Sequence, residues 1–309
     1  MTLTRSRQLV LALALGALNI LATSADTAER TAESNVADWQ PIAEAFGRPG
    51  TLLPGDIYRV GLPRTDLTVT VQGVQVKAGF ALGSYAAFKK MGASAMVMGD
   101  LVLLDQEINP VMSGLHERGL IVTALHNHLI NLSPHVMYLH YTGHGAPADL
   151  ARSLRAALSV TGTPFGPPAQ GTGGELGIPK TQVDAVIGRT GTINNGVLQF
   201  SVARAERITE GKVLLLPGMG VATVINLQPT GDGKAAATGD FVLVAREVNP
   251  VARALQAHGI QVTAIHQHAL ADNPRLFYMH FWANDDAVQL ARGLRAALDL
   301  TNSPKEKPQ

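Results

Sequence analysis

The chain contains one sequence unit twice, and this duplication limits the folds that it can adopt. Residues 99–161 align without gaps onto residues 239–301, and 27 of these 63 positions are identical. That number is too high for chance, so the chain carries two homologous halves. The offset of 140 residues is too long for a solenoid repeat and fits two tandem units of domain size.

The composition between the two copies marks the boundary of each half. Residues 162–180 are dense in glycine and proline, which is typical of a linker. We therefore expect a first half over residues 26–161 and a second half over residues 181–301. The last residues, 302–309, are polar and predict a disordered tail.

The repeated unit predicts two helices and three strands. Asn109-Pro110 resembles a helix start, with asparagine as the N-cap and proline in the first turn, and Gly119 is a suitable C-cap. In the first copy we expect strands at 100–108, 121–129 and 136–142, and helices at 109–118 and 147–158. Each half is therefore predicted to be α+β, a mainly antiparallel sheet with a βαββα core packed by helices. A ferredoxin-like arrangement is compatible with this core, as an analogy of folds only.

The first 25 residues have the pattern of a secretory signal peptide. Arg5 and Arg7 precede an apolar stretch, and Thr23 and Ala25 supply the small residues of a cleavage site. The apolar stretch is shorter than the ~20 residues that span a bilayer, although a retained anchor is the alternative. We expect an exported protein, periplasmic or secreted, with no membrane span after cleavage. The chain has no cysteine, so its stability cannot depend on disulfides.

The charge pattern excludes one class of partner. The formal net charge is +1, and no basic run is longer than Lys89-Lys90. A nucleic-acid-binding surface needs clustered basic residues, so we expect no nucleic acid partner. The remaining partners are a small molecule or a component of the cell envelope.

Histidines at matched positions point to a metal site. His126 and His128 are two residues apart in a predicted strand, so their side chains leave the same face. His140 lies on the next predicted strand, where it can approach the pair. The second half repeats this spacing with its own three histidines: His266, His268 and His280. Three imidazoles from neighbouring strands suit a divalent metal, with zinc expected first and iron or manganese as alternatives.

The duplication separates these six histidines from the other four. His116, His135, His144 and His258 each face a different residue type in the other copy. His144 is present only in the first half, which makes that half the better candidate for activity. Glu107 and Glu247 are also matched, and such a carboxylate can be a fourth ligand, a general base or a partner that orients an imidazole.

Three functions are open at this point. The first is a metal-dependent hydrolase, in which a metal-activated water attacks the substrate and Glu107 acts as the catalytic base. The second is a binding protein without turnover, for a metal, a small ligand or an envelope polymer. The third is a structural role, in which the histidines satisfy buried polar groups.

Several segments resemble a known family. These are GDLVLLDQEINPV, TALHNHL, YLHYTGHG and DLARSLRAAL, together with the stretch from Tyr58 to Phe88. They are similar to the LppY/LpqO family of exported bacterial proteins, whose function is unknown. The resemblance implies export and a common fold, but it implies no reaction and no catalytic residues. Because the family's namesakes are lipoproteins and this chain lacks the required cysteine, we expect a protein without a lipid anchor.

Overall fold

The structure is a computed structural model that describes residues 36–166 and 176–304. The chain divides into two compact units, Met1–Pro41 and Ile42–Gln309, and the second contains both halves of the duplication. The predicted signal peptide lies outside the described residues, as do parts of the predicted linker and tail. Among the residues described, no helix combines the length and apolar character needed to cross a membrane.

The first half forms a six-stranded antiparallel sheet beside a smaller sheet. The large sheet has the strand order β1-β2-β5-β6-β9-β7 and the small one β4-β3-β8. The strands are β1 (Thr51–Leu53), β2 (Ile57–Pro63), β3 (Val69–Val71), β4 (Val74–Val76), β5 (Gly83–Met91), β6 (Ser94–Leu104), β7 (Ile121–His126), β8 (Leu132–Ser133) and β9 (Val136–Gly145).

The second half repeats this topology strand by strand. Its large sheet has the order β10-β11-β14-β15-β18-β16, and its small sheet β13-β12-β17. The strands are β10 (Thr192–Asn194), β11 (Val197–Ala203), β12 (Ile208–Glu210), β13 (Val213–Leu215), β14 (Ala222–Gly231), β15 (Lys234–Val244), β16 (Gln261–His266), β17 (Asp272–Asn273) and β18 (Leu276–Asp286). The predicted fold class, two tandem α+β halves with antiparallel sheets, is confirmed.

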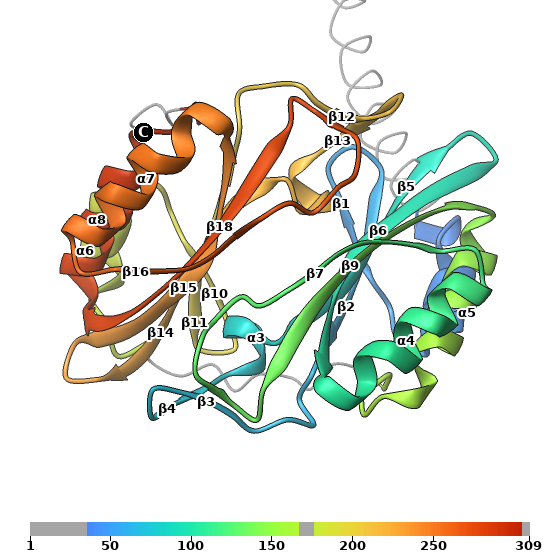
Figure 1. Ribbon diagram of the computed structural model, residues 1–309, viewed down its shortest axis with the longest axis horizontal. Helices are drawn as coiled ribbons and strands as arrows, with labels where there is room; N and C mark the ends of the chain where they lie inside the picture. Colours follow the sequence, from blue (N-terminus) through green and yellow to red (C-terminus); the bar gives the residue numbers. More distant parts are fainter. Residues whose placement is uncertain (1–35, 167–175, 305–309) are drawn as a thin grey trace, which may run out of the picture. The chain divides into compact units, whose positions relative to one another are not determined.

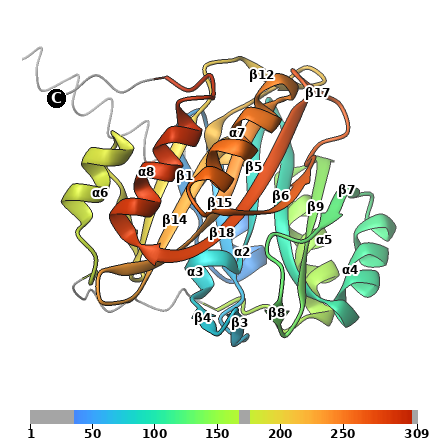
Figure 2. The ribbon, with the colours of Figure 1, turned by 60° about the vertical axis from the view of Figure 1, so that its left-hand side comes forward.

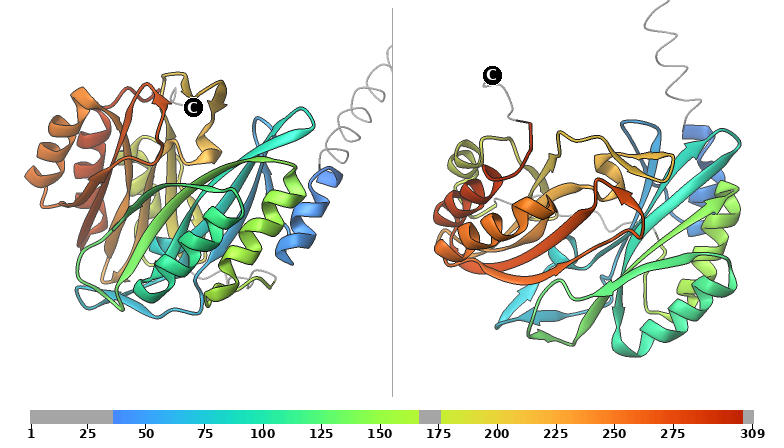
Figure 3. Two further views of the ribbon diagram at one scale, coloured as in Figure 1. Left: turned by 45° about the vertical axis from the view of Figure 1, so that its right-hand side comes forward. Right: turned by 45° about the horizontal axis from the view of Figure 1, so that its top comes forward.

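The longer helices lie on the outer faces of the two large sheets, whereas the short helix at Ala78–Ala81 lies between them. Figure 1 shows α4 and α5 against the first sheet and α6, α7 and α8 against the second, while the other faces of the sheets are turned toward each other. Figure 2 shows α6, α7 and α8 side by side on the second sheet, and Figure 3 gives two further views of the same layers. The helices are α2 (Gln40–Phe46), α3 (Ala78–Ala81), α4 (Asp105–Glu117), α5 (Pro147–Ala157), η1 (Leu158–Val160), α6 (Lys180–Ile187), η2 (Pro217–Met219), α7 (Ala245–Ala257) and α8 (Ala287–Leu298).

The βαββα unit is present in both halves, but its first helix begins earlier than predicted. Strand β6 ends at Leu104, and α4 starts at Asp105 with Pro110 inside it. Asn109 is therefore not the N-cap. The Glu107 carboxylate accepts a hydrogen bond from the Leu104 amide, so the helix is capped at Leu104, five residues before the predicted N-cap.

Alternation along the central strands decides which side chains face the other half. In β15 and β18, Phe241 and Phe281 belong to the core that packs against the helices. Val242 and Tyr278, which are opposite each other in the same two strands, belong to a second core that also contains Met96 and Met98 of β6. A third core joins Val102 of the first half to Trp282 of the second, so residues of even number in these strands lie between the two sheets.

A matched pair of glycines allows neighbouring strands to approach closely next to the acidic residues of β6 and β15. A Cβ atom added to Gly239 would lie 1.9 Å from the Val224 carbonyl oxygen, and one added to Gly99 would lie 2.1 Å from the Tyr85 carbonyl oxygen. Both obstacles are backbone atoms, which cannot rotate away. The duplication therefore retained glycine at these positions for a steric reason.

We expect Gly239→Ala to destabilise the protein by about 1–3 kcal/mol, because the methyl group overpacks two paired strands. Gly61→Ala is the control, since a Cβ there has no heavy atom within 4 Å. The free energy of unfolding of both variants is measured by chemical denaturation. Equal stability of the two variants would contradict this account of the strand approach.

Candidate metal centre

The six matched histidines meet in one cluster between the two sheets. His126 ends β7 and His266 ends β16, whereas His140 and His280 lie within β9 and β18. The His126 ring centroid lies 5.1 Å from that of His128 and 4.9 Å from that of His140. In the second half, the His266 centroid lies 4.9 Å from that of His268 and 4.8 Å from that of His280. The two sets therefore form one centre and not two.

Three contacts join the histidines of one half to those of the other. The ring centroids of His126 and His266 are 3.4 Å apart. His128 stacks on His280 at 3.7 Å, and His140 stacks on His268 at 3.7 Å. His128 and His140 of the first half correspond to His268 and His280 of the second, so these two pairs exchange under the duplication. The cluster thus has an approximate two-fold symmetry, with His126 and His266 at its axis.

Two aspartates that the sequence analysis did not select lie beside the histidines. Asp100 of β6 is directly opposite His140 of β9, and Asp240 of β15 is opposite His280 of β18. The Asp100 carboxylate oxygens lie 3.6 Å from His128 Nε2 and 3.7 Å from His140 Nε2. The corresponding distances from Asp240 are 3.8 Å to His268 and 3.9 Å to His280. These separations are too long for hydrogen bonds, so each carboxylate faces its imidazoles without pairing with them.

The cluster also contains every buried side-chain nitrogen or oxygen without a hydrogen-bond partner in the described part of the chain. The atoms are Asp100 Oδ1, Asp240 Oδ1, the Nε2 atoms of all six histidines and His266 Nδ1. An unpaired buried polar group costs about 1–3 kcal/mol, and such groups are rare in folded proteins. Their concentration at one point makes this cluster the candidate site for a ligand.

Burial keeps the imidazoles in the form that binds metals. It lowers the pKa of His126 to about 4 and that of His266 to about 3. The pKa values of the other four histidines also fall well below the usual value, first through burial and then through the neighbouring imidazoles. All six are therefore neutral at pH 7, and each offers a lone pair.

Backbone carbonyls fix the orientation of two of these rings. His126 Nδ1 lies 3.1 Å from the Asn127 carbonyl oxygen, and His280 Nδ1 lies 2.8 Å from the Gly239 carbonyl oxygen. A carbonyl only accepts hydrogen bonds, so Nδ1 of each ring carries the proton and donates it. The lone pair is then on Nε2, which points into the cluster. Metal-binding histidines commonly have this arrangement.

Burial acts in the opposite direction on the carboxylates. It raises the pKa of Asp100 to about 8, although Arg59 opposes the shift, and it raises the pKa of Asp240 well above the usual value. A nearby cation would favour the charged form of both residues. Both aspartates are repeat-matched acids inside apolar strands, and this was the sequence signal that could have identified them.

The two matched tyrosines cover the cluster on opposite sides. The Tyr138 ring stacks on His128 at 3.3 Å, and the Tyr278 ring stacks on His268 at 3.5 Å. Both tyrosines are buried, and the Tyr138 hydroxyl donates a hydrogen bond to the Ala81 carbonyl oxygen. They therefore pack the imidazoles in place as part of the core.

The four unmatched histidines are all exposed. His135 pairs with Asp105 at 2.7 Å, and His258 Nδ1 lies 2.9 Å from the Ala254 carbonyl oxygen of its own helix. His144 lies on β9 in register with Met96, one residue before the end of the strand. It is not among the residues that form the cluster, so it gives no reason to assign activity to the first half.

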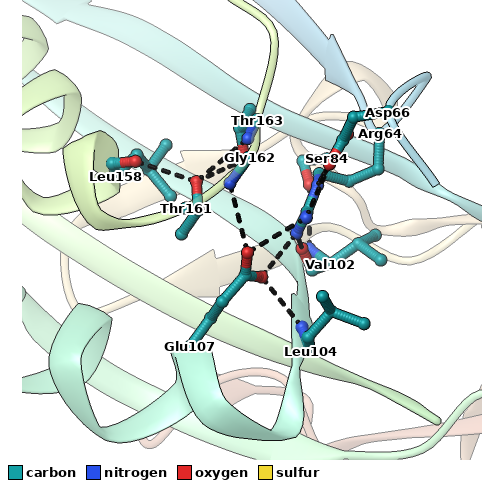
Figure 4. A network of polar contacts seen from close by, with 10 residues as sticks. All are labelled: Arg64, Asp66, Ser84, Val102, Leu104, Glu107, Leu158, Thr161, Gly162 and Thr163. Atoms are coloured by element: carbon teal, nitrogen blue, oxygen red, sulfur yellow. Dashed lines mark hydrogen bonds and ion pairs between the residues drawn. The ribbon is translucent and has the colours of Figure 1, made fainter. Parts of the chain in front are cut away.

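Glu107 has a different environment from the one expected of a catalytic base. Figure 4 shows its carboxylate between the Arg64 guanidinium, the Leu104 amide and the Gly162 amide. Arg64 Nη1 donates to Glu107 Oε2 at 2.6 Å, and Arg64 Nη2 donates to Oε1 at 3.1 Å. The Gly162 amide donates to Oε1 at 3.2 Å. This carboxylate is buried and fully paired, so we do not assign it the role of base or metal ligand.

The second half contains the same ion pair. Arg204 Nη1 donates to Glu247 Oε2 at 2.7 Å, and the amides of Val244 and Asn302 donate to the same carboxylate. In each half the pair joins the start of the first helix of the unit to the end of β2 or β11 and to the segment that follows the last helix. Its conservation between the two halves is explained by this structural role.

We expect Glu107→Ala to destabilise the protein by about 3 kcal/mol, the lower end for breaking a buried ion pair, because the buried Arg64 guanidinium loses one carboxylate but keeps Asp66. The melting temperature and the metal content of the remaining folded protein are both measured. A variant of normal stability that loses its bound metal would restore Glu107 as a ligand.

Comparison with known proteins was consistent with the duplication. Residues 40–160 and 181–300 each match a family model described as Domain of Unknown Function (DUF1259). The chain belongs to this family. It carries the DUF1259 domain twice, and the two matches coincide with the two halves of the fold. This assignment supports an uncharacterised domain family, and the resemblance to LppY/LpqO proteins stays a prediction.

Other comparisons add no function to the DUF1259 assignment. No curated protein matches the chain. One solved structure that matches is a trimeric bacterial microcompartment shell protein, PduB, at 15% identity. The match covers 85% of this chain and 98% of that one, with a TM-score of 0.23, which is too low to support an argument about fold or assembly.

Proposed function

We propose that this DUF1259 protein binds divalent metal in a single centre built by both of its halves. The observation that carries the proposal is the group of nine unpaired buried donor atoms, all contributed by six histidines and two aspartates. A hydrogen-bonded structural network would satisfy these atoms, whereas a cation would use them as ligands.

The spacing of the donor atoms supports this function. Three overlapping sets have ligand atoms within 4.8 Å of one another. The sets are His126, His128 and His140; His126, His266 and His268; and Asp240, His268 and His280. Imidazole with carboxylate suits zinc, iron and manganese, and we propose zinc first.

Elemental analysis of the purified protein tests the proposal. We expect bound divalent metal in the wild type and a loss of at least half of it in His140→Ala. His144→Ala is the matched control, because His144 lies on the same strand but is exposed, and its metal content should equal that of the wild type. A wild type that holds no stoichiometric metal after reconstitution would overturn the proposal. So would a His140→Ala variant with a lower melting temperature and full metal content.

A second proposal concerns chemistry at the metal. The side chains of His128 and Asp240 are 18% and 17% exposed, so water reaches the edge of the centre. A bound metal would lower the pKa of such a water and make it a nucleophile for hydrolysis. Asp100 and Asp240 replace Glu107 as the nearest acids able to take its proton. Because only a small part of these two side chains is exposed, we propose a small substrate or a protruding group of an envelope component.

We expect hydrolysis of small ester or amide substrates by the metal-loaded protein, lost after chelation and restored by zinc. His140→Ala should lose the activity and His144→Ala should keep it. Metal binding without turnover across such substrates would favour the non-catalytic binding protein instead.

Export remains part of this proposal and is supported by the pattern of residues 1–25 alone. N-terminal sequencing of the protein from cell fractions is the test. We expect a mature chain that begins after Ala25 in the periplasm or the medium, and an intact N-terminus in the cytoplasm would contradict it.

A further inference from the structure

We infer that the centre holds two divalent cations, one for each half, stacked across the approximate two-fold axis. This inference rests on the proposed metal-binding function and adds to it the number of ions and the ligands of each. It follows from the two different sets of distances among the histidine rings.

Rings of the same half are spaced as ligands of one ion. Each half has a central ring, which is His126 in the first half and His266 in the second. The centroids of the other two rings of the half lie 4.8–5.1 Å from the centroid of this central ring. Two imidazoles that bind one zinc through Nε2 at about 2.0–2.1 Å have centroids about 5 Å apart at a tetrahedral angle. Each histidine triad can therefore converge on its own ion.

Rings of opposite halves are spaced as two stacked layers. The three pairs across the halves are 3.4–3.7 Å apart, with interplanar angles of 19–23°. The lone pair of an imidazole lies in the plane of its ring, so two rings stacked face to face do not share one ion. Two ions, one in each layer, would be separated by a similar distance, and about 3.5–4 Å is the usual spacing in two-metal sites.

One of the three sets of possible ligand atoms contains residues of both halves, and the closeness of the two layers of rings explains this set. His126 lies within reach of His266 and His268 because it stacks directly on His266. Its lone pair is directed within the first layer, toward the space that it shares with His128 and His140. The crossing set thus results from the stacking and does not require a third position for a metal.

Each layer contains one carboxylate. Asp100 faces His128 and His140 of the first layer, and Asp240 faces His268 and His280 of the second. The three imidazoles of a layer would leave the fourth position of a tetrahedral zinc open for water or an anion, and the carboxylate of that layer would lie beside this position. Each half therefore supplies a donor set of its own: His126, His128 and His140 form a compact set in the first half, and Asp240, His268 and His280 form one in the second, next to His266.

The charges of these groups indicate what else the centre binds. Two divalent cations bring four positive charges and the two carboxylates bring two negative ones, while the imidazoles are neutral. The excess is costly in a buried site, so the pair of ions needs an anionic ligand. A bound water that releases a proton to solvent supplies hydroxide, and a small anionic substrate could take the same place.

The number of ions distinguishes this inference from the proposed function. The full chain is stripped of metal, reconstituted with zinc, freed of unbound zinc and analysed for zinc per chain. We expect two zinc ions per chain, and X-ray absorption should show zinc–zinc scattering at about 3.5–4 Å. One ion per chain at saturation would overturn the inference and leave the proposed function intact. No bound ion would overturn both.

Variants of each layer provide a second test. His140→Ala and His280→Ala each remove one ligand of one layer, so each should retain one zinc per chain without zinc–zinc scattering. The double variant should retain none, and His144→Ala should retain two. If either single variant loses all of its zinc while the wild type binds only one ion, the two layers form a single site and the inference fails.

Discussion

The stacking of two sets of three imidazoles between the sheets is the contact around which this protein is built. It places His126, His140 and their counterparts, with two aspartates, where water is largely excluded. Burying these groups opposes folding unless a ligand or cation compensates them. The surrounding structure supplies the apolar contacts that make such burial possible, through the cores that join Met96 and Val242, and Val102 and Trp282. The burial of the site therefore depends on the apolar cores that join the two halves.

The buried ion pairs have a different task. Arg64 with Glu107, and Arg204 with Glu247, connect helix starts to strand ends and to the segments that leave each half. Every carboxylate oxygen there has a donor, in contrast to the unpaired oxygens of Asp100 and Asp240. Two matched acids of each half thus differ in function because one is saturated by arginine and the other is not. This contrast is the physical basis for assigning a structural role to the first and for proposing metal binding at the second.

Much of the fold was accessible from the sequence. The duplication predicted two halves of the same topology, and the patterns of apolar residues predicted the βαββα unit in each. The start of α4 was misplaced, because Asn109-Pro110 resembles a helix start when the Glu107 cap is not known. The partner of Glu107 was not accessible either, because Arg64 is 43 residues away in sequence and follows a different strand. Asp100 and Asp240 were overlooked for a related reason, since an acid inside an apolar strand gains meaning only when its neighbours are known.

The sequence by itself determined that the chain is duplicated, that six histidines are matched and that four are not. These are properties of local pattern and spacing. Because side chains alternate between the two faces of a strand, the spacing also predicts which side chains share a face. The tertiary structure alone decided that the two triads meet, with His126 against His266 at 3.4 Å. It also decided that the acids beside them are Asp100 and Asp240. Both facts depend on which strands are neighbours and on how the two sheets face each other, and no spacing within one half encodes those relations.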